Sequence, residues 1–203
     1  WAGAARFSLM GRTGFIALAT IVAFGLLGAL GPSPARPAGP VPEAPADGPL
    51  WAMARSSLEN LAEIDEEATA RALNAPRTLV QGDLPLRGDP NPSGWRTTSA
   101  AHWTSYAQFA ADVAAGAVPG YIEVAHYDNE SWEQTPTGEQ AHPAAFERRF
   151  CALAHANGWD CLTSPGQDLC GGLAHPRGDN YAHCYVDLNL AGKAARVADL
   201  VDI

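Results

Sequence analysis

The chain has 203 residues, a length that favours one domain, or two at most. Hydrophobic residues make up 47% of it, which excludes a disordered chain, and the formal net charge of −9 disfavours a nucleic-acid or anionic-membrane partner for the folded part. The first residue is Trp1 rather than Met, and residues 200–203 have the composition of a buried strand. We therefore expect a fragment of a longer protein.

Residues 1–31 have the pattern of an export signal. Arg6 and Arg12 precede an uncharged, mostly apolar run over residues 13–31, and small residues follow it. A basic segment, an apolar segment and small residues in this order are typical of a secretory signal peptide. Because the apolar run is close to the ~20 residues that span a bilayer, an uncleaved membrane anchor is the alternative. The pattern predicts a secreted or cell-surface protein.

Residues 32–49 contain seven prolines. Closely spaced prolines interrupt both helices and sheet ladders, and they favour an extended chain. We expect a linker here, followed by a folded domain over residues 50–203.

Helices and strands alternate along this predicted domain. Apolar residues at three- and four-residue steps predict a helix within residues 51–73, and a short strand is expected at residues 78–81. A loop rich in Pro and Gly follows at residues 82–94, and a second helix is expected from Ser105 to Gly116.

Residues 121–128 form the clearest strand pattern in the chain. The next helix is expected to begin at Pro143, in the first helical position, and to end at Gly158 in a left-handed cap. A long polar loop up to about Tyr185 separates the later elements. These are expected at residues 159–163 (strand), residues 190–198 (helix) and from residue 200 onward (strand).

This order of elements is typical of right-handed β-α-β units with a parallel sheet. A complete eight-fold β/α barrel needs ~250 residues, whereas residues 50–203 supply 154. The predicted fold class is therefore α/β: an incomplete, TIM-like β/α barrel cut after three or four strands. The alternative is a small open parallel sheet.

The four cysteines lie close together in sequence, at Cys151, Cys161, Cys170 and Cys184. An even number of cysteines in an exported protein favours disulfides. Of the three possible pairings, one closes the Gly-rich loop between Cys170 and Cys184 and leaves Cys151 with Cys161. Unpaired thiols are one alternative. A zinc site with nearby histidines is another, although the close Cys-x-x-Cys pairs that such sites usually contain do not occur.

Residues 127–136 follow the clearest strand, at the sheet edge where β/α proteins bind ligands and carry out catalysis. Asp128 and Glu130 are candidate catalytic carboxyl groups of a glycosidase, which needs one acid and one nucleophile or base. Either one could instead act with Asp168 or Asp202. The remaining candidate substrate-binding residues are the two aromatic side chains and one histidine near the strand end: Tyr127, Trp132 and His126.

Other interpretations of these residues remain open. Short acids after a strand often cap turns or are solvated, in which case Asp128 and Glu130 have no chemical role. His126, Asp128 and Glu130 also suit a hard metal ion, but strand alternation alone places them on one face. No Gly-x-Gly-x-x-Gly or phosphate-binding loop is present, so no nucleotide cofactor is expected.

The motif Trp103-Thr104-Ser105, together with Tyr127-Asp128-x-Glu130-x-Trp132-x-x-Thr135-Pro136-x-x-Glu139-Gln140, resembles a group of secreted proteins from high-GC Gram-positive bacteria. The later motifs Phe150-x-x-Leu153-Ala154-His155-x-x-Gly158 and Ser164-Pro165-x-x-Asp168-Leu169 are similar too. The resemblance implies a secreted β/α barrel of glycosidase-like build, and it implies no particular reaction.

The leading hypothesis is an exported, glycoside hydrolase-like protein that acts on an extracellular carbohydrate or cell-wall polymer. A non-catalytic protein that binds such a polymer is the alternative. A metal-dependent hydrolase that uses His126 and Asp128 is a third. A membrane contact is expected only through residues 13–31, if they are not removed.

Overall fold

The computed structural model describes residues 41–44, 48–82, 88–173 and 181–203, all of which belong to one unit, Ala38–Ile203. The predicted export segment 1–31 and most of the predicted linker lie outside the described residues. No helix in the described ranges is both long enough and apolar enough to cross a membrane.

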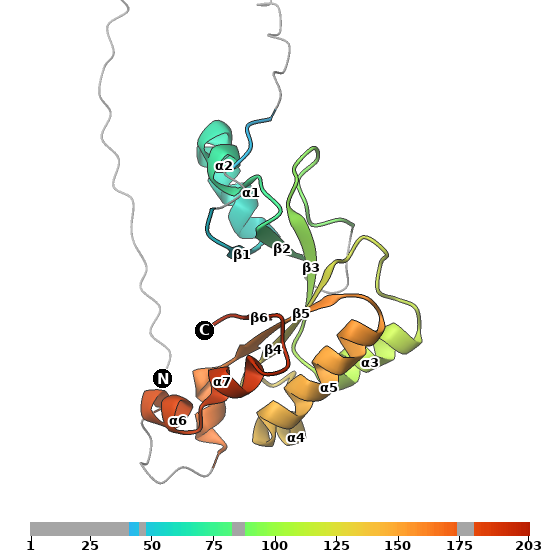
Figure 1. The fold of residues 1–203 in the computed structure, drawn as a ribbon, viewed down its shortest axis with the longest axis vertical. Coiled ribbons are helices and arrows are strands. Elements are labelled where there is room, and N and C mark those ends of the chain that lie inside the picture. Colours follow the sequence, from blue (N-terminus) through green and yellow to red (C-terminus); the bar gives the residue numbers. More distant parts are fainter. Residues whose placement is uncertain (1–40, 45–47, 83–87, 174–180) are drawn as a thin grey trace, which may run out of the picture. The chain divides into compact units, whose positions relative to one another are not determined.

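Six parallel strands form a curled half-barrel in which each strand pairs with the next one along the chain (Figure 1). This confirms the predicted fold class, an incomplete α/β barrel or open parallel sheet, but the expected number of three or four strands is wrong, because six are present in the described residues. The strands are β1 (Trp51–Ala54), β2 (Thr78–Gly82), β3 (Thr98–Trp103), β4 (Val124–Asn129), β5 (Asp160–Pro165) and β6 (Leu200–Val201).

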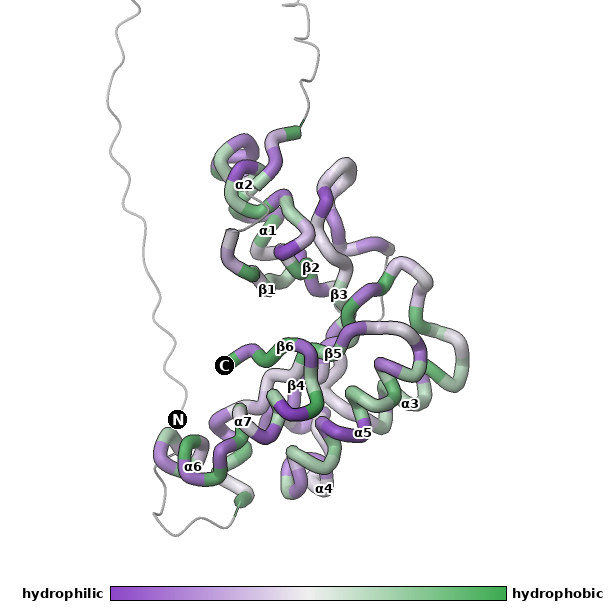
Figure 2. The backbone as a smooth tube through the Cα atoms, viewed as in Figure 1, coloured by the Kyte–Doolittle hydropathy of each residue, from purple (hydrophilic) through white to green (hydrophobic). Residues whose placement is uncertain are grey.

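Helices connect the strands. The first three are α1 (Arg55–Ile64) and α2 (Glu66–Leu73), between β1 and β2, and α3 (Tyr106–Ala114), between β3 and β4. The others are α4 (Thr137–Ala141), α5 (Pro143–Ala156), the short 3-10 helix η1 (Gln167–Gly171), α6 (Tyr181–Asp187) and α7 (Leu190–Ala194). Apolar and polar residues alternate along α1 and α5 (Figure 2), as expected of helices with one side against a sheet.

Three sequence predictions of secondary structure are wrong. The long polar loop expected up to about Tyr185 contains η1 and the first residues of α6. The expected helix over residues 51–73 begins instead with strand β1, and it is broken at Asp65, whose side chain accepts a hydrogen bond from the backbone N–H of Ala68 and caps α2. Strand β3 lies in a stretch for which no strand was expected. Its Thr, Ser and Ala side chains carry little hydrophobic signal, and pairing with β2 and β4 makes it a strand.

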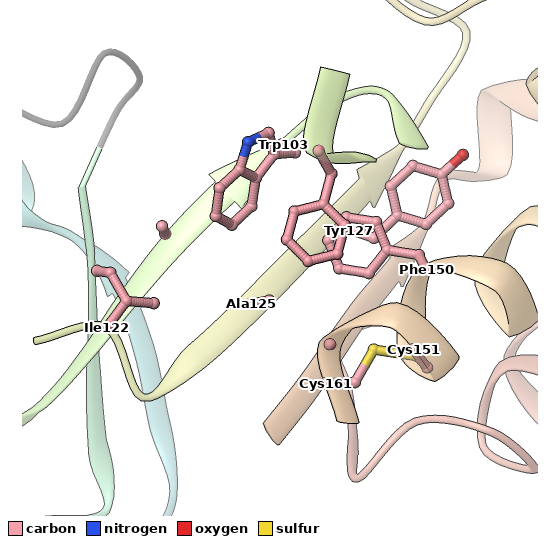
Figure 3. Close-up of a cluster of buried hydrophobic side chains, with 10 residues drawn as sticks. Trp103, Ile122, Ala125, Tyr127, Phe150, Cys151 and Cys161 are labelled. Atoms are coloured by element: carbon pink, nitrogen blue, oxygen red, sulfur yellow. A yellow bond between two sulfur atoms is a disulfide. The ribbon is translucent and has the colours of Figure 1, made fainter. Parts of the chain in front are cut away.

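The main core lies between the sheet and helices α3 and α5. Trp103, Tyr127 and Phe150 are buried there (Figure 3), and the ring of Phe150 stacks on Tyr127 with 4.8 Å between centroids. A disulfide between Cys151 and Cys161 links α5 to β5 within this core.

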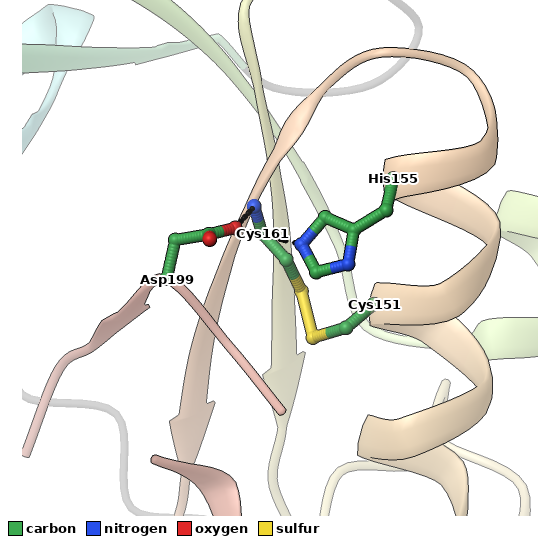
Figure 4. The surroundings of a disulfide bond; sticks show 4 residues. All are labelled: Cys151, His155, Cys161 and Asp199. Atoms are coloured by element: carbon green, nitrogen blue, oxygen red, sulfur yellow. Dashed lines mark hydrogen bonds and ion pairs between the residues drawn. A yellow bond between two sulfur atoms is a disulfide. The ribbon is translucent and has the colours of Figure 1, made fainter. Parts of the chain in front are cut away.

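The prediction of disulfides is confirmed, and of the three possible pairings the protein has the one that closes the loop between Cys170 and Cys184. Cys170 pairs with Cys184, which ties η1 to α6, and Cys151 pairs with Cys161. Beside the second pair, Asp199 accepts hydrogen bonds of 2.8 Å from the Cys161 backbone N–H and from His155 Nε2 (Figure 4). These contacts attach the end of α5 to the segment that leads into β6.

The face of the sheet that points away from α3 and α5, here called the inner face, is apolar near the amino ends of the strands. Its buried side chains are Leu79, Ala100, Val124 and Leu162. Because side chains alternate along a strand, the next inner-face residues toward the carboxyl ends are His102 on β3, His126 on β4 and Ser164 on β5. The inner face therefore changes from apolar to polar where the strands end.

Residues 41–44, at the end of the predicted linker, lie against the folded unit. The backbone N–H of Ala44 donates to Asn74 O at 3.0 Å, and Asn74 Nδ2 donates to Pro42 O at 2.7 Å. Glu43 forms an ion pair with Arg96. Two hydrogen bonds with Asn74 and one ion pair thus hold this segment in place.

Candidate functional site

Two histidines and their partners line the carboxyl ends of β3, β4 and β5. His102 Nε2 lies 3.2 Å from Asp128 Oδ2, and both side chains are partly exposed. His126 Nε2 lies 2.6 Å from Ser164 Oγ, and the two imidazole rings are 5.6 Å apart between centroids. Neighbouring strands therefore bring two polar pairs together on the inner face.

His126 is the buried member of this group, with 4% of its surface exposed. Its Nδ1 is buried without a hydrogen-bond partner. Burial lowers the pKa of His126 to about 4, and the charge of nearby Asp128 only partly opposes this shift. The imidazole is consequently neutral at physiological pH. It contacts Ser164 through a hydrogen bond of a neutral ring and not as a cation.

Glu130 is the carboxyl group whose surroundings favour the protonated form. Partial burial raises its pKa, and the carboxylates of Asp128 and Asp168 raise it further. A hydrogen bond with Trp132 and the proximity of His102 act in the opposite direction without reversing the shift. Glu130 is thus suited to donate a proton.

Gly166 makes this crowding of carboxyl groups possible. A Cβ atom on Gly166 would lie 2.5 Å from Asp168 Oδ1 and 2.7 Å from Glu130 Cγ. Asp168 is held in place because its Oδ2 accepts a 3.0 Å hydrogen bond from the backbone N–H of Ser131. The η1 helix that carries Asp168 also carries Cys170, which is joined to α6 through Cys184.

The loop after β4 presents Trp132 beside His102, with a centroid distance of 6.4 Å and an edge-on arrangement. Gln140 fixes this loop: its Nε2 donates to Trp132 O at 3.0 Å and to Thr135 O at 2.7 Å. Its Oε1 accepts a hydrogen bond from Ser131 Oγ at 3.1 Å. One side chain from α4 thus holds the backbone around Trp132.

Tyr127 does not belong to this group, so the prediction that its ring contacts a substrate is wrong. The residue points to the helix-covered face of the sheet and is fully buried. Its hydroxyl donates a 2.7 Å hydrogen bond to Glu139 Oε2. Glu139, also buried, accepts further hydrogen bonds from the backbone N–H groups of Tyr106 and Ala107 at the start of α3.

The structure brings together five of the residues singled out from the sequence: His126, Asp128, Glu130, Trp132 and Asp168. Asp202 is different. It is exposed at the end of β6, its backbone N–H donates to Thr163 O, and it is not among the charges that shift the pKa of Glu130. Asp168 is therefore the second carboxylate beside Glu130.

His102 is not among the residues predicted from the sequence, because it lies on β3, a strand that was not predicted. Sites made of three or more His, Cys, Asp or Glu side chains suited to a metal ion are absent from the described part of the chain. Comparisons with protein-family models, curated proteins and solved structures found no match, and the chemistry of the site rests on its own residues.

Proposed function

We propose that Asp128, Glu130, Asp168 and Trp132 form the active site of an exported, glycoside hydrolase-like protein that acts on an extracellular carbohydrate or cell-wall polymer. The observation that carries the proposal is the unequal environment of two neighbouring carboxyl groups. A histidine lies beside Asp128, whereas burial and two carboxylates raise the pKa of Glu130. Glycosidases need two carboxyl groups in different environments, one that donates a proton and one that acts as nucleophile or base.

In this proposal Glu130 is the general acid that protonates the leaving oxygen of the glycosidic bond. Asp128 is the nucleophile, or the base that activates water, and His102 orients it. Trp132 supplies a flat apolar surface on which a sugar ring can pack. The two disulfides support export, since such bonds persist mainly in oxidising compartments.

The test uses the full chain with neutral, amino-sugar and uronic-acid polysaccharides and with peptidoglycan, and measures the release of reducing ends. Replacement of Glu130 by Gln, or of Asp128 by Asn, should lower kcat about 10²–10⁴-fold without loss of fold. Glu133→Gln is the matched control, because Glu133 is an exposed carboxylate in the same loop. Equal kcat values in all four proteins would eliminate the proposed roles.

The leaving group separates the two roles. The dinitrophenolate group of a dinitrophenyl glycoside leaves without protonation, so Glu130→Gln should lower kcat for this substrate less than about tenfold. Asp128→Asn should lower kcat for it as much as for the natural polymer. If the unmodified protein binds a polysaccharide and releases no product, catalysis is contradicted. The non-catalytic binding protein predicted as the alternative is then favoured, and binding should persist in both variants.

A further inference from the structure

A second group of polar side chains is buried on the opposite side of the sheet from the proposed active site. Glu147, on α5, is 1% exposed, and neither of its carboxylate oxygens has a hydrogen-bond partner. Thr163, on β5, is fully buried and its Oγ1 is also unpartnered. The hydroxyl of Tyr185, on α6, is also buried and has no hydrogen-bond partner.

The disulfide places Glu147 opposite Thr163. Cys151 on α5 is bonded to Cys161 on β5, and the helix runs antiparallel to the strand, as in any β-α-β unit. Glu147 lies four residues before Cys151, a helical distance of about 6 Å. Thr163 lies two residues beyond Cys161, a strand distance of about 6.6 Å. Both steps lead toward the same end of the sheet.

Titratable groups on three other elements interact electrostatically with Glu147. Lys193 on α7 acts on it as the nearby cation, and its own side chain is exposed. Glu147 in turn acts on Tyr127 of β4 and on Tyr185 of α6, both of which stay protonated at neutral pH. Tyr185 is also influenced by Asp202. Among the groups that interact electrostatically with Glu147, Lys193 is the only basic side chain.

A buried carboxylate must be protonated, paired or bound to a metal ion. Burial raises the pKa of Glu147 to about 7, so above that pH protonation no longer removes its charge. Glu147 makes no salt bridge with Lys193. The unpartnered buried atoms of Glu147, Thr163 and Tyr185 are all oxygens, which are the ligands that hard cations prefer. A single carboxylate with neutral hydroxyl groups balances one positive charge, whereas divalent sites usually contain more carboxylates.

We propose that ionised Glu147, together with the hydroxyl groups of Thr163 and Tyr185, binds one monovalent metal cation, sodium or potassium. The cation neutralises a carboxylate that no side chain pairs with, and it joins α5, β5 and α6 at one point. Lys193 competes with it, because its ammonium group can supply the same charge from the surface.

The test measures thermal unfolding of the full chain at pH 8 in sodium, potassium or choline chloride of equal ionic strength. Choline is too large for a buried site, so sodium or potassium should raise Tm, by about 2–5 °C at ten times the dissociation constant. Glu147→Gln should abolish the difference between the salts. Lys193→Met should strengthen cation binding at least about threefold, since it removes the competitor. Glu133→Gln is the control with an exposed carboxylate.

Direct binding is measured by line broadening in ²³Na magnetic resonance, which should be lost in Glu147→Gln and retained in Glu133→Gln. Equal Tm values in the three salts, with no broadening, would overturn the proposal. So would an ion-dependent Tm that persists in Glu147→Gln. Neither result bears on the proposed glycosidase, whose residues lie on the other face of the sheet.

Discussion

Glu130 and Asp168 meet above Gly166, with Asp168 Oδ1 and Glu130 Cγ both within 3 Å of the position that a Cβ atom on Gly166 would take. The backbone of Gly166 is ordinary, with φ of −69°. Glycine is therefore needed here for space and not for backbone conformation. The close approach of the two carboxyl groups depends on the absence of one methyl group.

Gly166→Ala should consequently disturb the site more than the fold. The added methyl group must displace the flexible side chain of Glu130 or Asp168, so we expect a loss of only about 1 kcal/mol in the free energy of unfolding. Glycan hydrolysis should fall at least about tenfold. Gly172→Ala is the control, because a Cβ there would meet no atom closer than Leu169 O at 3.8 Å. Equal losses of activity in both variants would contradict this view of Gly166.

Asp168→Asn tests the electrostatic effect of Asp168 on Glu130. The negative charge of Asp168 helps to raise the pKa of Glu130, so its removal should lower that pKa. A general acid works only while protonated, and activity falls as pH rises through its pKa. The alkaline limb of the pH–kcat profile should therefore move to lower pH in Asp168→Asn. A limb that stays in place would assign it to another group.

His126 and Glu147 should give the stability of the protein opposite dependences on pH. Burial lowers the pKa of His126 from 6.5 to about 4, so the folded state binds fewer protons and stability falls as pH drops from 6.5 toward 4. Burial raises the pKa of Glu147 from 4.5 to about 7, so stability falls as pH rises through that range. Each effect amounts to at most about 3 kcal/mol.

Single substitutions separate these two contributions. In choline buffer, Glu147→Gln should leave a free energy of unfolding that increases from pH 4.5 to 6.5, because only the histidine effect remains. His126→Gln should leave one that decreases from pH 5 to 7. Urea unfolding at half-unit intervals of pH measures both slopes. Parallel curves for the two variants and the unmodified protein would contradict the assignment.

The two disulfides should differ in their effect on activity. They join residues 10 and 14 positions apart, so removal of either should cost about 2–4 kcal/mol of unfolding free energy. Only the pair of Cys170 and Cys184 holds the helix that carries Asp168. The double Ala variant of this pair should lose glycan hydrolysis in steady-state assays, whereas Cys151→Ala with Cys161→Ala should retain it as long as the protein is folded.

The sequence was sufficient to predict the parallel α/β architecture, the strong strand β4 and the presence of disulfides, but it left the choice among three pairings open. It was insufficient for strands β1 and β3. Residues 51–54 are adjacent to a helical repeat that masks them, and β3 is made of small side chains whose burial comes from neighbouring strands. Because β3 was not predicted, His102, the partner of Asp128, was not predicted either.

Strand alternation separated His126 and Asp128 from Tyr127, but it did not indicate which set faces the helices. Packing decides this: the rings of Tyr127 and Phe150 stack, so Tyr127 must point toward α5. The buried position of Glu139 could not be predicted either, because its partners at the start of α3 lie 32 and 33 residues earlier in the chain. Local patterns carry no information on such distant contacts.

That distant contact has a consequence for the order of folding. As the chain leaves the ribosome, Ser105 alone can cap α3, through the backbone N–H of Gln108. The backbone N–H groups of Tyr106 and Ala107 bind the carboxylate of Glu139, which is synthesised more than thirty residues later. The start of α3 thus gains these two hydrogen bonds only after β4 and α4 have emerged, which couples the stability of α3 to that of α4.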